Sequence, residues 1–171
     1  MEHSNGHIYD CFPLNILDVI EAAAMDSKRA LTAKGLSLNI NMPEKVLMIH
    51  GDRKKLFQAL SYLLDNSIKF SPSGSTIILS VTETDDRLYV SIEDKGVGII
   101  EEHLSRIFES FNQGDCSITR KYPGVGLGLN ICRRIIQHHE GDIRVESKAN
   151  EGSTFHIGLP KKKLFANHMP F

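Results

Sequence analysis

The sequence predicts an α+β fold, a two-layer sandwich in which helices cover one face of a mixed, mostly antiparallel sheet. Strand-like segments come in neighbouring pairs along the chain and not singly between helices. Paired strands join into hairpins, whereas a doubly wound parallel sheet needs a helix after each strand. The chain has 171 residues, 41% of them hydrophobic, which is enough for one domain with a real core.

The first predicted elements are a helix and two strands. Residues 13–35 carry apolar side chains at helical spacing, with Pro13 near the start and Gly35 past the end. Residues 36–42 alternate apolar and polar side chains, which is typical of a strand. The short apolar run at 46–49 predicts a second strand.

The strongest helix signal lies in residues 51–74. Its apolar stripe consists of Leu56, Leu60, Leu63, Leu64 and Ile68. Asp52 is predicted to cap the N-terminus, and the Ser-Pro-Ser-Gly sequence at the other end stops the helix. Two strand-like runs at 75–84 and 87–94, joined by the polar turn Asp85–Asp86, predict an antiparallel hairpin.

The remaining predicted elements follow a long loop. Residues 94–125 are mostly loop, with a short helix predicted over 101–108. A further helix is predicted over 126–141, where Gly141 is a natural stop. The last two strands form a hairpin, at 142–147 and 153–160.

Composition narrows the class of protein. The net charge of −1 gives no reason to expect contact with nucleic acid or with a membrane surface. No apolar run approaches the ~20 residues that cross a bilayer. The three widely spaced cysteines are typical of reduced thiols in a cytoplasmic protein. We expect one domain at 12–160, with loose ends at 1–11 and 161–171.

Three glycines alternate before an apolar run, at Gly124, Gly126 and Gly128. The spacing matches neither the GxGxxG of dinucleotide folds nor the GxxxxGK[ST] of P-loops. Free N–H groups at a helix start can approach phosphate oxygens, and Arg120 and Lys121 can add charge-assisted contacts. From these residues alone, an anion-binding loop and an ordinary flexible loop are equally good interpretations.

A second glycine motif, Asp-Lys-Gly-Val-Gly-Ile, occupies residues 94–99. It places Asp94 at the end of a predicted strand, and Gly96 and Gly98 allow close backbone approach. A carboxylate there can accept a hydrogen bond from an exocyclic amine such as N6 of adenine, worth roughly 1.5–3 kcal/mol. Taken alone, the motif is more often a simple turn.

Two further groups of side chains suit a nucleotide site. Asn66 and Lys69 lie three apart on the strongest helix, where an amide oxygen can bind Mg²⁺ and an ammonium can bind phosphate. Thr154 begins the last strand and can place a hydroxyl near a nucleotide. A polar helix face and an ordinary hairpin are the alternatives.

In their order, these segments resemble the catalytic ATP-binding domain of bacterial sensor histidine kinases, a branch of the gyrase, chaperone, histidine kinase and mismatch-repair ATPase superfamily. The similarity covers approximately residues 12–160. The segments that resemble the N, G1, F and G2 boxes and the closing element of that domain are 51–74, 94–99, 107–115, 124–131 and 151–160.

The resemblance implies a site for Mg-ATP. Asn66 would hold Mg²⁺, Lys69 would contact phosphate and Phe70 would pack near the adenine. Asp94 would bind the adenine amine. The other nucleotide-binding residues implied by the resemblance are Gly96, Gly98, Ile99, Phe108, Arg120, Lys121, Tyr122, Gly124, Val125, Gly126, Leu127, Gly128, Leu129 and Thr154.

The resemblance also implies a mobile lid over the nucleotide at residues 109–125, held by Phe108 and Phe111. One position departs from the family pattern. Tyr62 stands one helical turn before Asn66, where relatives usually carry asparagine or a carboxylate. A phenol is a poor base at neutral pH, which argues against efficient activation of water.

A phosphoacceptor motif, His-Glu or His-Asp followed by Arg or Lys, Thr and Pro, does not occur in the sequence. His138 and His139 fall at a predicted helix end, where a positive charge complements the helix dipole. The resemblance therefore implies a monomeric catalytic domain that donates the γ-phosphate to a histidine on a separate dimerisation domain, and that reaches a response regulator indirectly.

A cytoplasmic location is expected for this domain, whether or not the parent protein is anchored in a membrane. Two alternatives stay open. One is a degenerate nucleotide-binding module with a regulatory role, which Tyr62 favours. The other is a relative that phosphorylates serine in a partner protein.

Overall fold

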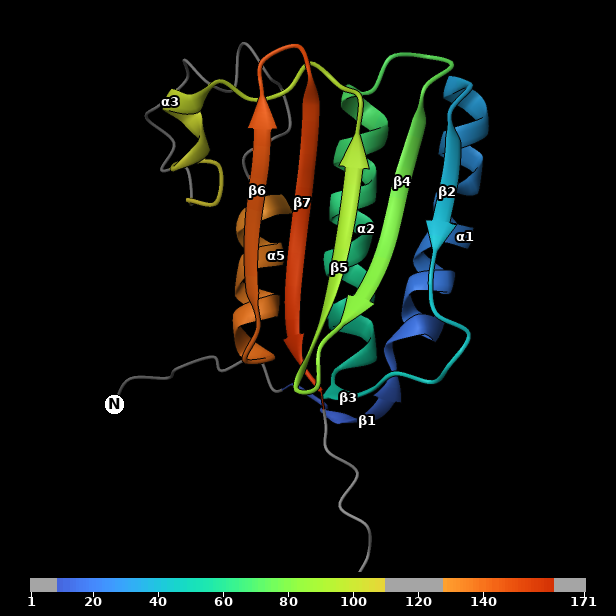
Figure 1. The fold of residues 1–171 in the computed structure, drawn as a ribbon, viewed down its shortest axis with the longest axis vertical. Helices are drawn as coiled ribbons and strands as arrows, with labels where there is room; N and C mark the ends of the chain where they lie inside the picture. The colour runs from blue at the N-terminus through green and yellow to red at the C-terminus, as the bar shows by residue number, and fades with distance from the viewer. Residues whose placement is uncertain (1–8, 110–127, 162–171) are drawn as a thin grey trace, which may run out of the picture.

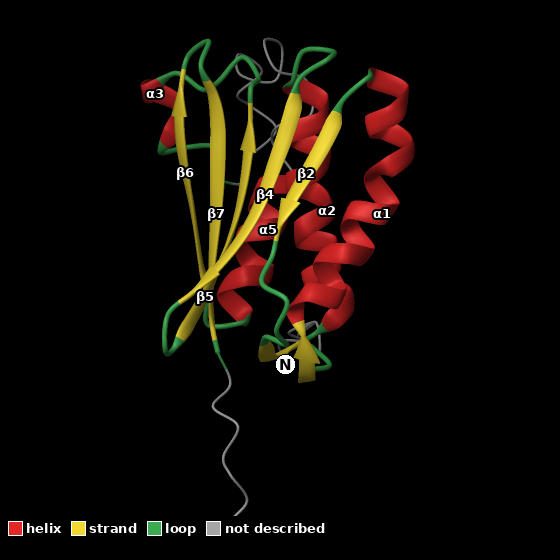
Figure 2. Cartoon of the chain, turned by 45° about the vertical axis from the view of Figure 1, so that its right-hand side comes forward, coloured by secondary structure: helices red, strands yellow, loops and turns green. Residues whose placement is uncertain are grey.

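A computed structural model of the chain describes residues 9–109 and 128–161. A five-stranded sheet, in the order β2-β4-β5-β7-β6, carries helices on one face and none on the other within these residues (Figures 1 and 2). Strand β2 runs parallel to β4, and the other neighbouring strands are antiparallel. The predicted α+β sandwich is therefore confirmed.

The described elements follow the predicted order, with one additional strand at the start. They are β1 (Phe12–Asn15), α1 (Ile16–Lys34), β2 (Ser37–Asn41), β3 (Met48–Gly51), α2 (Arg53–Phe70), β4 (Thr76–Glu83), β5 (Arg87–Asp94), α3 (Glu101–Leu104), α5 (Gly128–His138), β6 (Asp142–Lys148) and β7 (Gly152–Pro160).

The additional strand β1 pairs antiparallel with β3 in a small second sheet. The prediction that the first helix begins near Pro13 is therefore wrong. Pro13 lies in a strand of this small sheet, where its missing N–H group is tolerated at an edge. Helix α1 begins at Ile16 because Asn15 caps it, and the Asn15 Oδ1 also accepts the N–H of Leu47 at 3.0 Å.

The predicted ends of the two long helices are confirmed. Gly35 takes a left-handed conformation, with φ at 66°, and donates its N–H back to the last turn of α1. Asp52 caps α2 by accepting the N–H of Lys55 at 3.1 Å. Helix α2 ends at Phe70 before the Ser-Pro-Ser-Gly turn.

Helix α2 lies in the middle of the helical layer, between α1 and α5 (Figure 2). Its predicted apolar stripe is at most 7% exposed and faces the sheet. Burial of each such side chain contributes roughly 1.5–3 kcal/mol. The side chains opposite the stripe on the inner face of the sheet include Ile77, Leu79, Leu88, Val90 and Ile92. This packing fixes α2 above β5, and both elements carry predicted site residues.

Two elements in the second half are shorter than predicted. Helix α3 spans only Glu101–Leu104, and turns replace the rest of the predicted 101–108 helix. Helix α5 ends at His138. Glu140 takes the left-handed conformation (φ 56°), and Gly141 donates its N–H to the carbonyl of Ile136 at 2.9 Å.

His139, which follows the end of α5, is buried and serves as a link between elements. Its Nε2 accepts the N–H of Asp52 at 2.9 Å, and its Nδ1 lies 2.7 Å from the carbonyl oxygen of Ile135. A ring with these partners is neutral, and burial lowers the pKa of His139. The prediction of a positive charge here is therefore wrong for His139, which instead joins α5 to the N-terminus of α2.

We expect the buried imidazole to make the domain less stable in mild acid. The unfolded chain takes up a proton on His139 at about pH 6.5, before the folded chain does, so the free energy of unfolding falls as the pH drops below this value. Urea unfolding between pH 8 and pH 5 measures the effect. His139→Gln should reduce this pH dependence and His138→Gln, at the exposed neighbour, should retain it; equal dependence in the His139 variant and the wild type would contradict the prediction.

Candidate functional site

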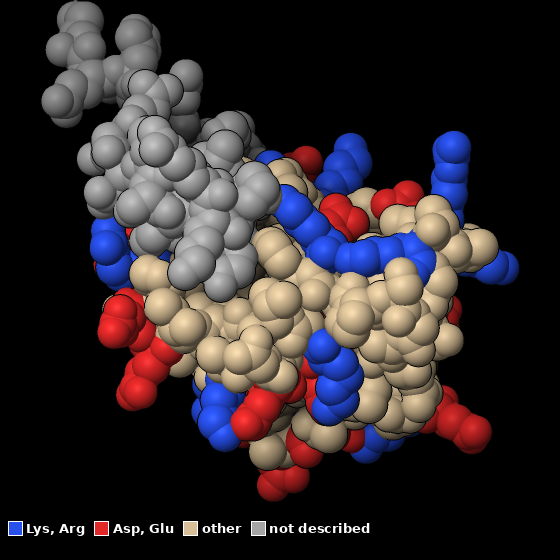
Figure 3. Space-filling model, turned by 90° about the horizontal axis from the view of Figure 1, so that it is seen from above, with Lys and Arg blue, Asp and Glu red and all other residues tan. Residues whose placement is uncertain are grey.

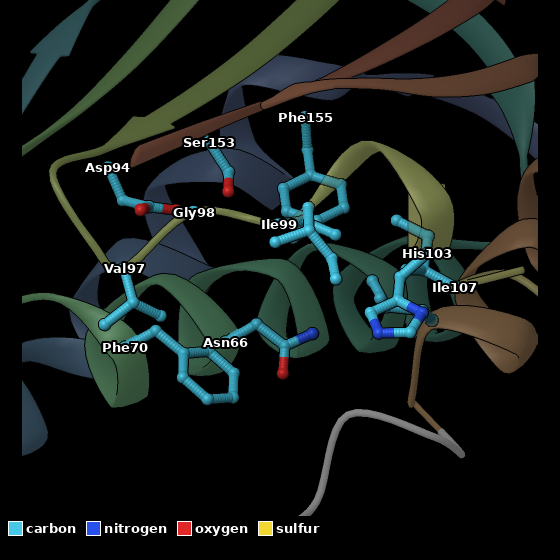
Figure 4. A pocket seen from close by; sticks show the side chains of 12 residues that line it. Asn66, Phe70, Asp94, Val97, Gly98, Ile99, His103, Ile107, Ser153 and Phe155 are labelled. Carbon is cyan, nitrogen blue, oxygen red and sulfur yellow. The ribbon is translucent and has the colours of Figure 1, made fainter. Parts of the chain in front are cut away.

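A cavity that is open to solvent lies between α2, the loop after β5, α3, α5 and the inner face of β7 (Figure 4). The apolar lining includes Phe70, Val97, Ile99, Ile107, Leu129 and Phe155. The polar side chains that line it are those of Asn66, Asp94, His103 and Ser153. An apolar cavity with a few polar groups suits a ligand that has a flat apolar part and polar ends.

Helix α2 brings two predicted residues to the cavity. Asn66 and Phe70 are four residues apart, so their side chains lie on the same face of the helix and both line the cavity. Lys69 is exposed, and its Nζ lies 5.5 Å from the centroid of the Phe70 ring. The ammonium group therefore lies near the rim and the other two side chains lie within the cavity.

Asp94, the last residue of β5, is the buried charged group of the cavity, with 5% of its surface exposed. Its Oδ1 accepts the N–H of Gly96 at 2.8 Å and its Oδ2 accepts the hydroxyl of Ser67 at 3.3 Å. Burial raises the pKa of Asp94, and hydrogen bonds from Gly96, Ser67 and the backbone of Ser153 act in the opposite direction. These partners compensate in part for burying an acceptor group.

The loop after β5 lies directly against the turn between β6 and β7. Gly98 has φ at 67°, and a Cβ atom there would lie 1.9 Å from the carbonyl oxygen of Lys148. Gly152 has φ at 98°, and a Cβ atom there would lie 2.1 Å from the carbonyl oxygen of Asp94. Only glycine fits either position, because both the conformation and the close contact exclude a side chain.

Ser147 of β6 supports the same loop and was not predicted. Its Oγ accepts the N–H of Ile99 at 2.8 Å and donates to the carbonyl oxygen of Gly152 at 2.9 Å. It also lies 2.8 Å from the Oγ of Ser153. One hydroxyl thus ties the loop after β5 to both strands of the last hairpin.

Helix α5 closes another side of the cavity. Its first described residue is Gly128, where a Cβ atom would lie 3.1 Å from the ring of Tyr62. The next residue, Leu129, is 1% exposed and lines the cavity. Tyr62 therefore packs α2 against the first turn of α5, and its hydroxyl accepts a hydrogen bond from Gln58 at 3.3 Å.

Phe108 lies beside the cavity and does not line it. Its ring meets the ring of Phe155 edge to face, with centroids 6.4 Å apart. The side-chain amide of Asn130 donates to the carbonyl oxygen of Phe108 at 3.0 Å, which ties the turn after α3 to α5. This arrangement anchors the residue that directly precedes the predicted lid.

The structure brings together six of the predicted residues around the cavity: Asn66, Phe70, Asp94, Gly98, Ile99 and Leu129. Lys69, Gly96, Phe108 and Gly128 lie next to lining residues. The predicted lid and the predicted residues Arg120, Lys121, Tyr122, Gly124, Val125, Gly126 and Leu127 lie outside the described residues.

Thr154 is the one predicted residue that the structure places elsewhere. It pairs with Glu93 and Glu146 in the sheet, and these three residues line a separate hollow. Side chains alternate between faces along a strand, so Ser153 and Phe155, on either side of Thr154, line the cavity. The strand was predicted correctly, and it brings the side chains of Ser153 and Phe155 to the cavity while that of Thr154 lies on the other face of the sheet.

Val97, Ile100, His103, Ile107, Ser153 and Phe155 also line the cavity and were missed. Ser153 and Phe155 could have been found from the sequence, because they stand at alternate positions of a predicted strand and therefore share one face of the sheet. His103 carried no such signal, since it sits in a short helix within a loop segment. In Figure 4, His103 and Ile107 lie at one end of the cavity, with Asp94 and Ser153 at the other.

Seen along the strands from the end at which the cavity lies, the described surface has a broad uncharged area that a few Lys and Arg side chains cross (Figure 3). Acidic and basic side chains are interspersed around it, consistent with the net charge of −1. Of the helices in the described part of the chain, none is long and apolar enough to cross a membrane.

Comparison with known proteins agrees with this geometry. Residues 51–163 match the family described as histidine kinase-, DNA gyrase B- and HSP90-like ATPase. The chain is 34% identical over 153 residues to the circadian input-output histidine kinase CikA of Synechococcus elongatus, which covers 90% of this chain and 20% of that protein. Across the curated relatives compared, the chain spans 8% to 20% of their length.

Two solved structures have similar folds. The catalytic domain of the histidine kinase ThkA superposes with a TM-score of 0.77 at 25% identity, over 90% of this chain and 99% of that one. Full-length ShkA in complex with AMPPNP superposes with a TM-score of 0.77 at 25% identity, over 91% of this chain and 32% of that one. The chain therefore belongs to the histidine kinase-, DNA gyrase B- and HSP90-like ATPase family, and the relative and the structural neighbours named above are histidine kinases.

Proposed function

We propose that this chain is the catalytic domain of a sensor histidine kinase, that it binds Mg-ATP in the cavity beside α2, and that it donates the γ-phosphate to a histidine on a separate dimerisation domain. The observation that carries the proposal is the pairing, in one apolar cavity, of the buried carboxylate of Asp94 with the side-chain amide of Asn66. The first suits a purine amine and the second suits a cation bound to phosphates.

The purine would occupy the end of the cavity near Asp94. The remaining lone pairs of this carboxylate can accept a hydrogen bond from N6 of adenine. Phe70, Val97 and Ile99 offer apolar surface to the faces of a planar base. A base with a carbonyl at the same position would present an acceptor to an acceptor, which disfavours guanine.

The side chains of the cavity suit a Mg²⁺ ion that is held mainly by the phosphates of a bound nucleotide. Within residues 9–109 and 128–161, no group of three His, Cys, Asp or Glu side chains could hold a metal ion by itself. Asn66 offers a single amide oxygen, and Mg²⁺ typically binds through one or two protein oxygens together with phosphates and waters. When bound, the ion would neutralise charge on the phosphates.

The protein's contribution to phosphoryl transfer would be positioning. Asp94 and the apolar lining would fix the base, Asn66 would fix the cation, and Lys69 at the rim would meet a phosphate oxygen. The predicted lid would exclude water from the γ-phosphate. Tyr62 offers no general base at its position, which suits transfer to an acceptor better than hydrolysis.

The alternative of a regulatory module without kinase activity is favoured by one observation. Tyr62 packs against Gly128, and it stands at the position where the resemblance leads us to expect asparagine or a carboxylate. We also propose the partners and the location expected above: an acceptor domain, a response regulator reached through it, and the cytoplasm. One folded domain over 12–160 is part of the same proposal.

Labelled ATP distinguishes these functions. We expect the isolated chain to bind ATP in a Mg²⁺-dependent manner by calorimetry without labelling itself, and to label an acceptor domain of the parent protein added in trans. Asn66→Ala should remove the Mg²⁺ dependence of triphosphate binding. An acid-labile label on the isolated chain would contradict the proposal, and binding without transfer to the added domain would favour the regulatory module.

A further inference from the structure

Ser67 is a buried residue of α2 whose hydroxyl points away from its own helix. It is 1% exposed and donates to the Oδ2 of Asp94 at 3.3 Å. A buried serine in a helix ordinarily donates to the carbonyl four residues back, as Ser27 of α1 does to Ala23 at 2.9 Å. A hydroxyl has a single donor hydrogen, so Ser67 uses it to bridge two elements that are far apart in the sequence.

The two oxygens of Asp94 are held in different ways. Oδ1 accepts the N–H of Gly96, which belongs to the same loop and moves with it. Oδ2 accepts the hydroxyl of Ser67, which belongs to α2, the helix that also carries Asn66 and Phe70. Only the second bond fixes the carboxylate relative to the helix that lines the rest of the cavity.

We infer that Ser67 is a positioning residue for purine recognition, an inference that rests on the proposed function. By holding Oδ2 against α2, its hydroxyl fixes the orientation of the carboxylate in the cavity, where the acceptor capacity that remains can take a hydrogen bond from an exocyclic amine. Ser67 itself does not touch the base. Its contribution is therefore to the preference for a 6-amino purine, and not to nucleotide affinity in general.

The electrostatics of the site support this role. Burial raises the pKa of Asp94, and so does the nearby carboxylate of Glu93. The Ser67 hydroxyl is one of three hydrogen bonds that oppose this effect, along with those from the backbone of Gly96 and Ser153. Ser67 thus also favours the ionised form, in which both oxygens of Asp94 are acceptors.

The test is a comparison of two nucleotides in calorimetry: ATP, and the analogue that has hydrogen in place of the 6-amino group. We expect the wild-type chain to bind ATP about tenfold or more tightly than the analogue. Ser67→Ala should weaken ATP by about two- to tenfold and leave the analogue unchanged, so that the preference shrinks. Ser27→Ala removes the same group from another buried helical serine and should change neither affinity.

The outcomes separate this inference from the proposed function. If the wild type binds both nucleotides equally, Asp94 does not bind the amine, and both ideas fail. If the wild type prefers ATP and Asp94→Asn loses that preference, but Ser67→Ala keeps it or weakens both nucleotides equally, only the role of Ser67 is overturned. In the double variant Ser67→Ala with Asp94→Asn, the serine substitution should have no further effect on the preference.

Discussion

Gly98→Ala is expected to lower the free energy of unfolding by roughly 2–5 kcal/mol and to abolish nucleotide binding. The new Cβ would lie 1.9 Å from the carbonyl oxygen of Lys148 and 2.7 Å from its carbon, both backbone atoms of the adjacent turn. Neither can rotate away, so the loop after β5 must move, and Asp94 moves with it. Urea unfolding measures the first effect and calorimetry with ATP the second.

Gly35→Ala is the matched control for this substitution. Gly35 has φ at 66°, almost equal to that of Gly98, yet no atom lies within 4 Å of the added Cβ. Gly35→Ala should therefore lower the free energy of unfolding by only about 1 kcal/mol, because alanine is strained in the left-handed conformation, and it should leave ATP binding intact. Equal losses of stability in the two variants would show that the contact with Lys148 does not matter.

Asp94→Asn is expected to raise the Kd for ATP by about tenfold to a hundredfold, because the variant loses one hydrogen bond between the purine amine and a charged group. The amide keeps one acceptor oxygen but adds a donor NH₂, which faces either the purine amine or the N–H of Gly96. The fold should survive, because burial already disfavours the charge of Asp94. Calorimetry gives the affinity and thermal unfolding the stability.

Glu93→Gln, one residue earlier on β5, is the control for Asp94→Asn. The side chain of Glu93 lies on the other face of the sheet, in an ion pair with Lys95. Its neutralisation should leave ATP affinity within about twofold, since an exposed pair contributes little. A normal Kd in the Asp94 variant would remove Asp94 from the purine site.

Local patterns in the sequence were sufficient for most elements. The apolar stripe of α2 and the capping residues Asp52 and Gly35 define helices through contacts within a few residues, and the structure agrees with them. The hairpin β4–β5 was equally readable, because its strands and its Asp85–Asp86 turn are adjacent in the chain. Such signals are physical properties of short segments and need no knowledge of distant partners.

Pairings between distant segments were not readable in the same way. Strand β1 exists only because β3 lies beside it, and without that partner its residues resemble the start of a helix. His139 resembled a charged helix end, but the N–H of Asp52 makes it a neutral, buried link. In each case the decisive partner is more than thirty residues away in sequence.

By itself, the sequence determined the fold class and the order of helices and strands, and it singled out Asn66 and Asp94, which both line the cavity. Only the tertiary structure decided which side chains enter the cavity: Ser153 in place of Thr154, His103 from a loop, and the serines at positions 67 and 147 as supports. Residue type and spacing encode what a segment forms and what its side chains can bind. The direction in which a side chain points depends on which face of a strand it occupies. The contacts that hold it in place depend on hydrogen bonds between segments far apart in the chain, which form only when the domain folds.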